Sequence, residues 1–132
     1  MTASDHVRCV RSIADVTGDD LDEVIVGIDE SQSDNVFCLD GASSGAATVV
    51  WSRLPVSGAS NGSPTGDDAI LPVSDLEGNG HPDLVVGTAW GGRSAHDLDG
   101  LDGSVNWTFD TYQTTDSGWV YSLAELNDSP GA

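Results

Sequence analysis

The chain has 132 residues, enough for one modest domain, and its 22 acidic residues against 4 basic ones give a formal charge of −18. Such a surface repels nucleic acid and anionic membranes, and no apolar run approaches the roughly 18 residues that span a bilayer. The first residues carry charges where a signal peptide needs an apolar stretch. We therefore expect a soluble segment without nucleic-acid binding or membrane insertion, and too small for a multidomain enzyme.

The acidic residues are mostly Asp, 18 against 4 Glu, and all four basic residues are Arg. Asp is a poor helix former that favours turns and binds hard cations. This composition predicts acidic loops between strands. A strongly hydrated acidic surface without Lys also suits saline surroundings, so a halophilic or marine source is a further hypothesis.

One unit of about 50 residues repeats along the chain, a length typical of repeat arrays. Segment 12–27 aligns residue by residue with segment 72–87, and segment 122–128 matches the opening of both. The extra residues of the first unit fall in a stretch rich in Gly, Ser, Asn and Pro, 57–68, which predicts a longer surface loop. We predict a first unit over residues 1–66, a second over 67–118, and the first strand and partial loop of a third over 119–132.

Each complete unit predicts four short strands separated by turn-forming residues. In chain order the first unit gives 7–14, 24–28, 36–39 and 48–52, and the second gives 69–73, 84–88, 95–98 and 105–109. No segment has a helical period of adequate length. Tandem units of four antiparallel strands are typical of β-propeller blades, so the predicted fold is all-β, with two full blades and the start of a third. Because propellers close with about four to eight blades, we expect either a homo-oligomer or further blades of a longer chain.

The loop after the first strand of each unit carries oxygen-bearing groups at alternate positions. The first loop offers Asp15, Thr17, Asp19, the carbonyl of Leu21, and Glu23; the second offers Asp75, Glu77, Asn79, the carbonyl of His81, and Asp83. Calcium takes about six to eight oxygen ligands in flexible geometry, and glycines let the backbone turn between them. The pattern predicts a Ca²⁺ site in each loop. A third loop, with Glu125 and Asn127, lacks the ninth position.

These loops resemble the Asp-x-(Asp/Asn)-Gly-(Asp/Asn)-Gly-x-x-Asp calcium loops of FG-GAP and VCBS repeats, as in integrin-like propellers. Asp15, Asp19, Asp75, Asn79 and Asp83 carry the match. The neutral Thr17 and the longer Glu23 and Glu77 depart from the pattern, and the Phe-Gly-Gly-Ala-Pro sequence of the family is absent. The resemblance implies calcium ions that stiffen the loops of a propeller.

A turn and a tryptophan follow the third predicted strand of both units. Leu39-Asp40-Gly41 precedes Trp51, and Leu98-Asp99-Gly100 precedes Trp107. This arrangement resembles the docking motif of quinoprotein (PQQ-like) repeats, which implies a Trp packed between neighbouring blades. Both resemblances imply one fold, but a fold of this kind hosts many functions.

Four further residues have two interpretations each. Cys9 and Cys38 fit no zinc motif and are expected either as buried thiols or as a disulfide. Trp90 and Arg93 have no counterpart in the first unit, so they are candidate contacts for a protein or glycan ligand, with packing against a neighbouring blade as the alternative. Carboxylate pairs arise by chance in so acidic a chain, and no catalytic triad, phosphate loop or zinc cluster is present. We therefore expect no catalytic residues.

Three functions fit these expectations. The first is a calcium-dependent scaffold for binding or adhesion, extracellular or at the cell surface by analogy with the family. The second is a fragment of a propeller enzyme, of the quinoprotein dehydrogenase or polysaccharide lyase type. The third is self-assembly, in which exposed strand edges join copies into rings or fibres.

Overall fold

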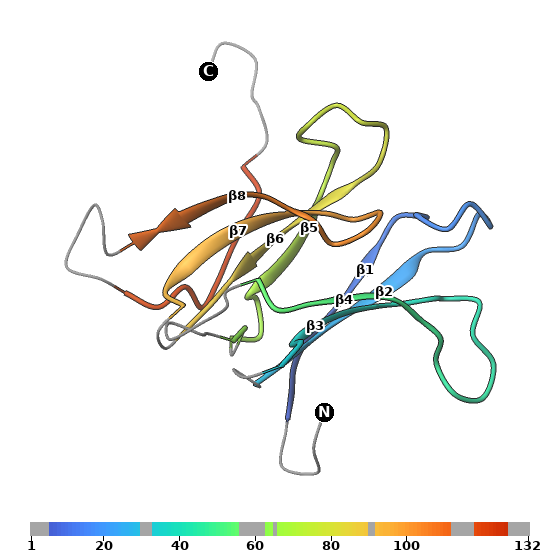
Figure 1. The fold of residues 1–132 in the computed structure, drawn as a ribbon, viewed down its shortest axis with the longest axis horizontal. Coiled ribbons are helices and arrows are strands. Elements are labelled where there is room, and N and C mark those ends of the chain that lie inside the picture. The colour runs from blue at the N-terminus through green and yellow to red at the C-terminus, as the bar shows by residue number, and fades with distance from the viewer. Residues whose placement is uncertain are drawn as a thin grey trace.

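The computed structural model describes residues 6–29, 33–55, 63–64, 66–89, 92–111 and 118–126. Within them, eight strands form two four-stranded antiparallel sheets that lie side by side (Figure 1). The all-β prediction is confirmed. No helix in this part of the chain is long and apolar enough to cross a membrane.

Each sheet is a meander whose strands follow chain order. The first sheet contains β1 (Val7–Ile13), β2 (Glu23–Ile28), β3 (Val36–Leu39) and β4 (Val49–Arg53); the second contains β5 (Ile70–Val73), β6 (Asp83–Gly87), β7 (Ser94–Asp99) and β8 (Val105–Asp110). The Val and Ile residues of these strands favour the pleated backbone. The pairing register shifts between Cys38 and Leu39 in the first sheet and between Asp97 and Leu98 in the second. The repeated sequence therefore folds into repeated structure, including the same irregularity.

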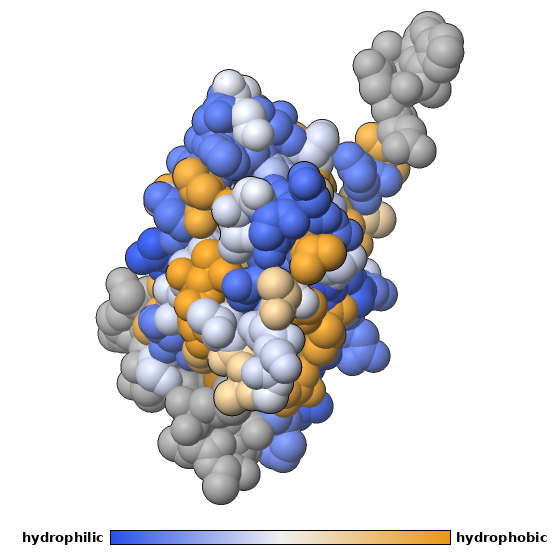
Figure 2. Space-filling model, turned by 90° about the vertical axis from the view of Figure 1, so that its right-hand side faces the viewer, coloured by the Kyte–Doolittle hydropathy of each residue, from blue (hydrophilic) through white to orange (hydrophobic). Residues whose placement is uncertain are grey.

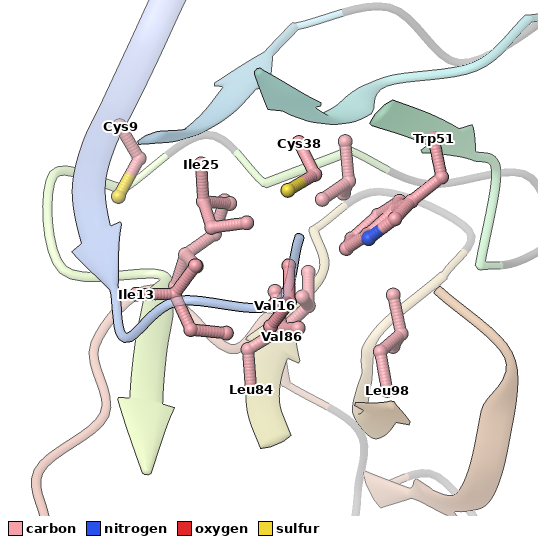
Figure 3. Close-up of a cluster of buried hydrophobic side chains, with 11 residues drawn as sticks. Cys9, Ile13, Val16, Ile25, Cys38, Trp51, Leu84, Val86 and Leu98 are labelled. Atoms are coloured by element: carbon pink, nitrogen blue, oxygen red, sulfur yellow. The ribbon is translucent and has the colours of Figure 1, made fainter. Parts of the chain in front are cut away.

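The main hydrophobic core lies between the two sheets (Figure 3). Ile13, Ile25 and Trp51 enter it from the first sheet, while Leu84 and Leu98 enter it from the second. Full burial of an aliphatic side chain of this size contributes roughly 1.5–3 kcal/mol. Each sheet therefore depends on the other for the face that it buries.

Cys9 and Cys38 lie in this core as free, buried thiols. Burial, with smaller effects from the charges of Glu23 and Asp40, raises the pKa of Cys38 to about 12. A thiol that stays protonated is a weak nucleophile and metal ligand. The structure thus selects the buried-thiol expectation over the disulfide.

Trp51 on β4 joins the first repeat to the turn after β7 in the second. Its indole Nε1 donates a 2.8 Å hydrogen bond to the carbonyl oxygen of Gly100. Its ring covers Gly103, where an added Cβ would lie 2.5 Å from a ring carbon, so this position requires glycine. Arg53 donates to the carbonyl oxygens of Asp102 and Gly103 at 2.8 and 2.9 Å. Three hydrogen bonds and one close ring contact therefore join the two repeats.

The first strands of successive repeats are neighbours. β1 lies next to β5, and Asp68, two residues before β5, forms a parallel bridge with Ser122. The side chain of Ile70 approaches Gly27, and that of Val120 approaches Gly87 in the same way. Val120 thus contacts the second repeat much as Ile70 contacts the first.

Candidate metal sites in the two acidic loops

The loop between β1 and β2 closes on Glu23, the first residue of β2 (Figure 1, in blue). Glu23 is fully buried, and its Oε2 accepts a 2.6 Å hydrogen bond from the backbone N–H of Val16. Its Oε1 accepts a 3.1 Å hydrogen bond from the hydroxyl of Thr17. Both ends of the loop are therefore held by one carboxylate that points into it.

Asp15 gives this loop its curvature. Its Oδ1 accepts from the N–H groups of Thr17 and Gly18 at 3.0 and 2.7 Å, and its Oδ2 accepts from that of Asp20 at 2.7 Å. Gly18 and Asp20 adopt φ angles of +90° and +67°, so the chain turns through the left-handed region twice. These bonds, with that from Gly18 the strongest influence, lower the pKa of Asp15. The carboxylate is therefore held in its anionic, metal-binding form.

The first loop gathers three of its predicted ligands. Carboxylate oxygens of Asp15, Asp19 and Glu23 all lie within 4.8 Å of one another. The hydroxyl of Thr17 is beside them through its bond to Glu23, and the N–H of Leu21 donates to Asp19 at 2.9 Å. Three of the five predicted positions thus bring their carboxylates together, and Thr17 adjoins them, while the Leu21 carbonyl stays a prediction.

The loop between β5 and β6 repeats this construction. Asp83, the first residue of β6, is fully buried, and its Oδ2 accepts a 2.6 Å hydrogen bond from the N–H of Leu76. Asp75 accepts from the N–H groups of Gly78 and Gly80, each at 2.7 Å. These bonds, that from Gly80 foremost, lower the pKa of Asp75. Asp75 and Asp83 therefore have the loop-shaping roles that Asp15 and Glu23 have in the first repeat.

The carboxylate cluster of the second loop has a different membership. Carboxylate oxygens of Glu77, Asp83 and Asp99 lie within 4.8 Å of one another, and Asp75 is not part of the group. Asn79 Nδ2 donates to Glu77 Oε1 and to Asp99 Oδ2, both at 2.6 Å. His81 contributes its N–H, which donates to Asn79 Oδ1 at 3.0 Å. Two of the predicted carboxylates are brought together, and the third comes from β7.

Like charges dominate this second cluster. Desolvation, followed by a side-chain hydrogen bond with Asp99 and then the charges of Asp99 and Asp83, raises the pKa of Glu77. The Oδ1 atom of Asp83 is buried and has no hydrogen-bond partner among the described residues. A buried carboxylate oxygen without a donor is costly, and a divalent cation offsets both the missing bond and the repulsion. The residues present therefore fit a cation.

Sequence reasoning missed Asp99 because it was assigned to a turn. In the structure Asp99 ends β7, is 9% exposed, and pairs directly with Asp83 across the ladder. The signal was present in the register of the β6–β7 hairpin, which places residue 99 opposite residue 83. Asp97, two residues earlier, is also buried, and desolvation raises its pKa, with Asp83 and Asp99 adding to the effect.

The other predicted site residues lie elsewhere. Trp90 and the third-loop residue Asn127 fall outside the described residues. Arg93 is half-buried, adopts a φ of +28°, and forms an ion pair with Asp110 on β8, with Nε and Oδ1 3.1 Å apart. Glu125 is exposed. Arg93 therefore already has a structural partner at the base of its hairpin.

Comparison of the chain with protein-family models, curated proteins and solved structures gave no significant match. The chemistry assigned to the two loops thus depends on their own geometry.

Proposed function

We propose that this chain is a calcium-stabilised segment of a β-propeller, with two blades and the first strand of a third, that acts as a scaffold for binding or adhesion. The observation that carries the proposal is that in both repeats three carboxylates converge within 4.8 Å, all three from the loop and its end in the first repeat and two of them, joined by Asp99 of β7, in the second. Carboxylates at this separation repel one another, and a divalent cation offsets that repulsion. The loops also resemble those of FG-GAP and VCBS repeats, in which calcium stiffens the blade.

Propeller architecture is supported by the way the repeats adjoin. Consecutive first strands are neighbours, and Trp51 docks on the turn of the next repeat. Trp107 holds the equivalent position on β8, yet it is 46% exposed, and Phe109 beside it is 49% exposed. Apolar surface is also visible among hydrophilic residues in Figure 2. A further blade, from a longer chain or from another copy, would cover this face of β8.

Calcium fits the two clusters better than magnesium or zinc. Each of the two clusters of candidate ligands contains Asp and Glu side chains and neither His nor Cys. Zinc prefers nitrogen and sulfur ligands, and magnesium requires near-ideal octahedral geometry, whereas calcium accepts mixed oxygen donors from a flexible loop. By analogy with the FG-GAP and VCBS repeats that the loops resemble, we place this scaffold outside the cell or at its surface.

Calorimetric titration of the metal-free chain with CaCl₂ tests the proposal, with MgCl₂ at matched ionic strength as the control. We expect two calcium ions to bind per chain and the melting temperature to rise with calcium but far less with magnesium. The double variant Glu23→Gln, Asp83→Asn keeps both loop-closing N–H acceptors and should lose both ions. Absence of binding heat, together with a melting temperature indifferent to calcium, would refute calcium stabilisation.

A further inference from the structure

Asp99 links the second carboxylate cluster to the turn on which the first repeat docks. Its Oδ2 accepts from Asn79 in the loop, and its Oδ1 accepts a 2.8 Å hydrogen bond from the N–H of Leu101 in the turn. Its backbone N–H donates to Ser104 and its carbonyl accepts from Gly103, at 2.8 and 2.7 Å. The orientation of this carboxylate and the shape of the turn are therefore fixed together.

The same turn is tied to the loop and to the neighbouring repeat through Gly100. The N–H of Gly100 donates to the carbonyl oxygen of Pro82, beside Asp83, at 3.0 Å. The carbonyl of Gly100 accepts the indole N–H of Trp51. The two backbone groups of one residue, Gly100, thus link Pro82, the neighbour of Asp83, to the Trp51 side chain.

Asp83 supplies independent support for a ligand at this place. It is fully buried, and its Oδ1 has no hydrogen-bond partner among the described residues although its Oδ2 is satisfied. Without an ion, repulsion from Glu77 and Asp83 acts directly on Asp99. An ion bound between them reverses the sign of that force and holds Asp99, and hence the turn, against the loop.

We infer that the second metal site is completed by Asp99 from β7, and that calcium bound there fixes the turn that receives Trp51, so that occupancy of the site controls the packing between the two repeats. This inference depends on the proposed calcium function. It goes beyond a loop site because its third ligand, the last residue of β7, is hydrogen-bonded to the docking turn.

The first repeat provides a built-in contrast. Asp40 is the equivalent of Asp99, and its Oδ1 accepts a 2.8 Å hydrogen bond from the N–H of Ala42, so it has the same role in the turn. Asp40 is not part of the first carboxylate cluster, which takes Asp15 from the loop instead. The same substitution at Asp40 and Asp99 therefore separates turn formation from metal binding.

Exchange of the Trp51 indole N–H with solvent deuterium, followed by NMR, reads the docking contact directly. Its resonance is the one that disappears in Trp51→Phe. An ion that binds only the closed turn slows exchange by about the ratio of calcium to its dissociation constant, roughly a hundredfold at hundredfold excess. In Asp99→Asn, calorimetry should show one of the two ions binding roughly tenfold or more weakly, and calcium should no longer slow the indole exchange. Asp40→Asn should retain both ions and the slowing.

Each contrary result identifies what has failed. If the wild-type chain binds no calcium, the proposed function and this inference fall together. If two ions bind and Asp99→Asn binds both with unchanged affinity, Asp99 is not a ligand and only the inference falls. If Asp99→Asn loses an ion but calcium leaves the wild-type indole exchange unchanged, the link between the site and the docking of Trp51 is refuted.

Discussion

Replacing Asp83 with Asn should stabilise the metal-free protein, although Asp83 is completely buried. The amide keeps the size of the side chain and the oxygen that accepts the N–H of Leu76. It replaces the unpartnered Oδ1 with an NH₂ group that donates toward Glu77 and Asp99, both within 4.8 Å. One substitution thus removes a buried charge, removes the repulsion between residue 83 and the neighbouring carboxylates, and gives the atom at the Oδ1 position a hydrogen-bond partner.

The size of the effect follows from the spacing of Asp83 and Asp99. Two unit charges 4.8 Å apart repel by about 3 kcal/mol at an effective dielectric constant of about 20. A new hydrogen bond to a carboxylate adds about 1 kcal/mol. We expect the free energy of unfolding in EDTA to rise by on the order of 3 kcal/mol, which corresponds to a rise in melting temperature of roughly 10 °C for a chain of this size.

Calcium should remove or reverse this advantage. The wild-type chain gains about 2.7 kcal/mol per site at a hundredfold excess of calcium over its dissociation constant, whereas Asp83→Asn lacks the gain from the second site. Differential scanning calorimetry in EDTA and in calcium measures both states. Asp102→Asn is the control, because Asp102 lies on the same turn but outside the cluster. Hydrogen bonds from Ser104 lower the pKa of Asp102, so loss of this carboxylate should destabilise the protein slightly in both buffers. If Asp83→Asn is less stable than the wild-type chain in EDTA, repulsion within the carboxylate cluster does not destabilise the metal-free protein, and the reasoning is refuted.

Two further predictions concern the core and the second sheet. Trp51→Ala should lower the free energy of unfolding, measured in urea, by about 3–5 kcal/mol, because Trp51 is 8% exposed and fills the contact between repeats. Trp107→Ala is the control and should lower it by less than about 1 kcal/mol, because Trp107 is 46% exposed. Equal losses would mean that the repeats do not dock through Trp51. Burial lowers the pKa of His96 to about 4, so between about pH 6.5 and 4 the unfolded chain binds a proton that the folded chain does not. Stability should therefore fall by about 1.4 kcal/mol per pH unit across that window and level off below it, and His96→Gln should remove this contribution. A stability difference between wild type and His96→Gln that is independent of pH would contradict the assignment.

The strands and both loops could be predicted because their signals are local. Apolar runs rich in β-branched residues, 24–28 and 84–88, mark β2 and β6, and the alternate oxygens with intervening glycines of residues 15–23 and 75–83 mark the loops. Asp99 could not be predicted in the same way, because its approach to Asp83 depends on the pairing register of two strands. Asp75 shows the reverse: the pattern made it a ligand, while the structure uses its oxygens to accept backbone N–H groups.

The burial of individual strand residues also could not be predicted from the sequence pattern. Trp51 and Trp107 hold equivalent positions after the same register shift, yet one is buried and the other is half exposed. The difference arises because the second repeat covers the first and nothing described covers β8. An expectation drawn from one repeat alone assigns both tryptophans the same environment.

The ninth residue of each loop has two roles that cannot be separated by removing its side chain. One oxygen of Glu23 or Asp83 accepts the N–H at the start of the loop, and the same carboxylate belongs to the cluster that is proposed to bind calcium. Truncation to Ala therefore removes the loop closure together with the metal ligand, and its effect on calcium binding would have no single cause. The amide variants preserve the first role and remove the second. This division accounts for an acidic residue that is fully buried at the first position of both β2 and β6: the backbone N–H requires an acceptor there, and the proposed ion would require a charge.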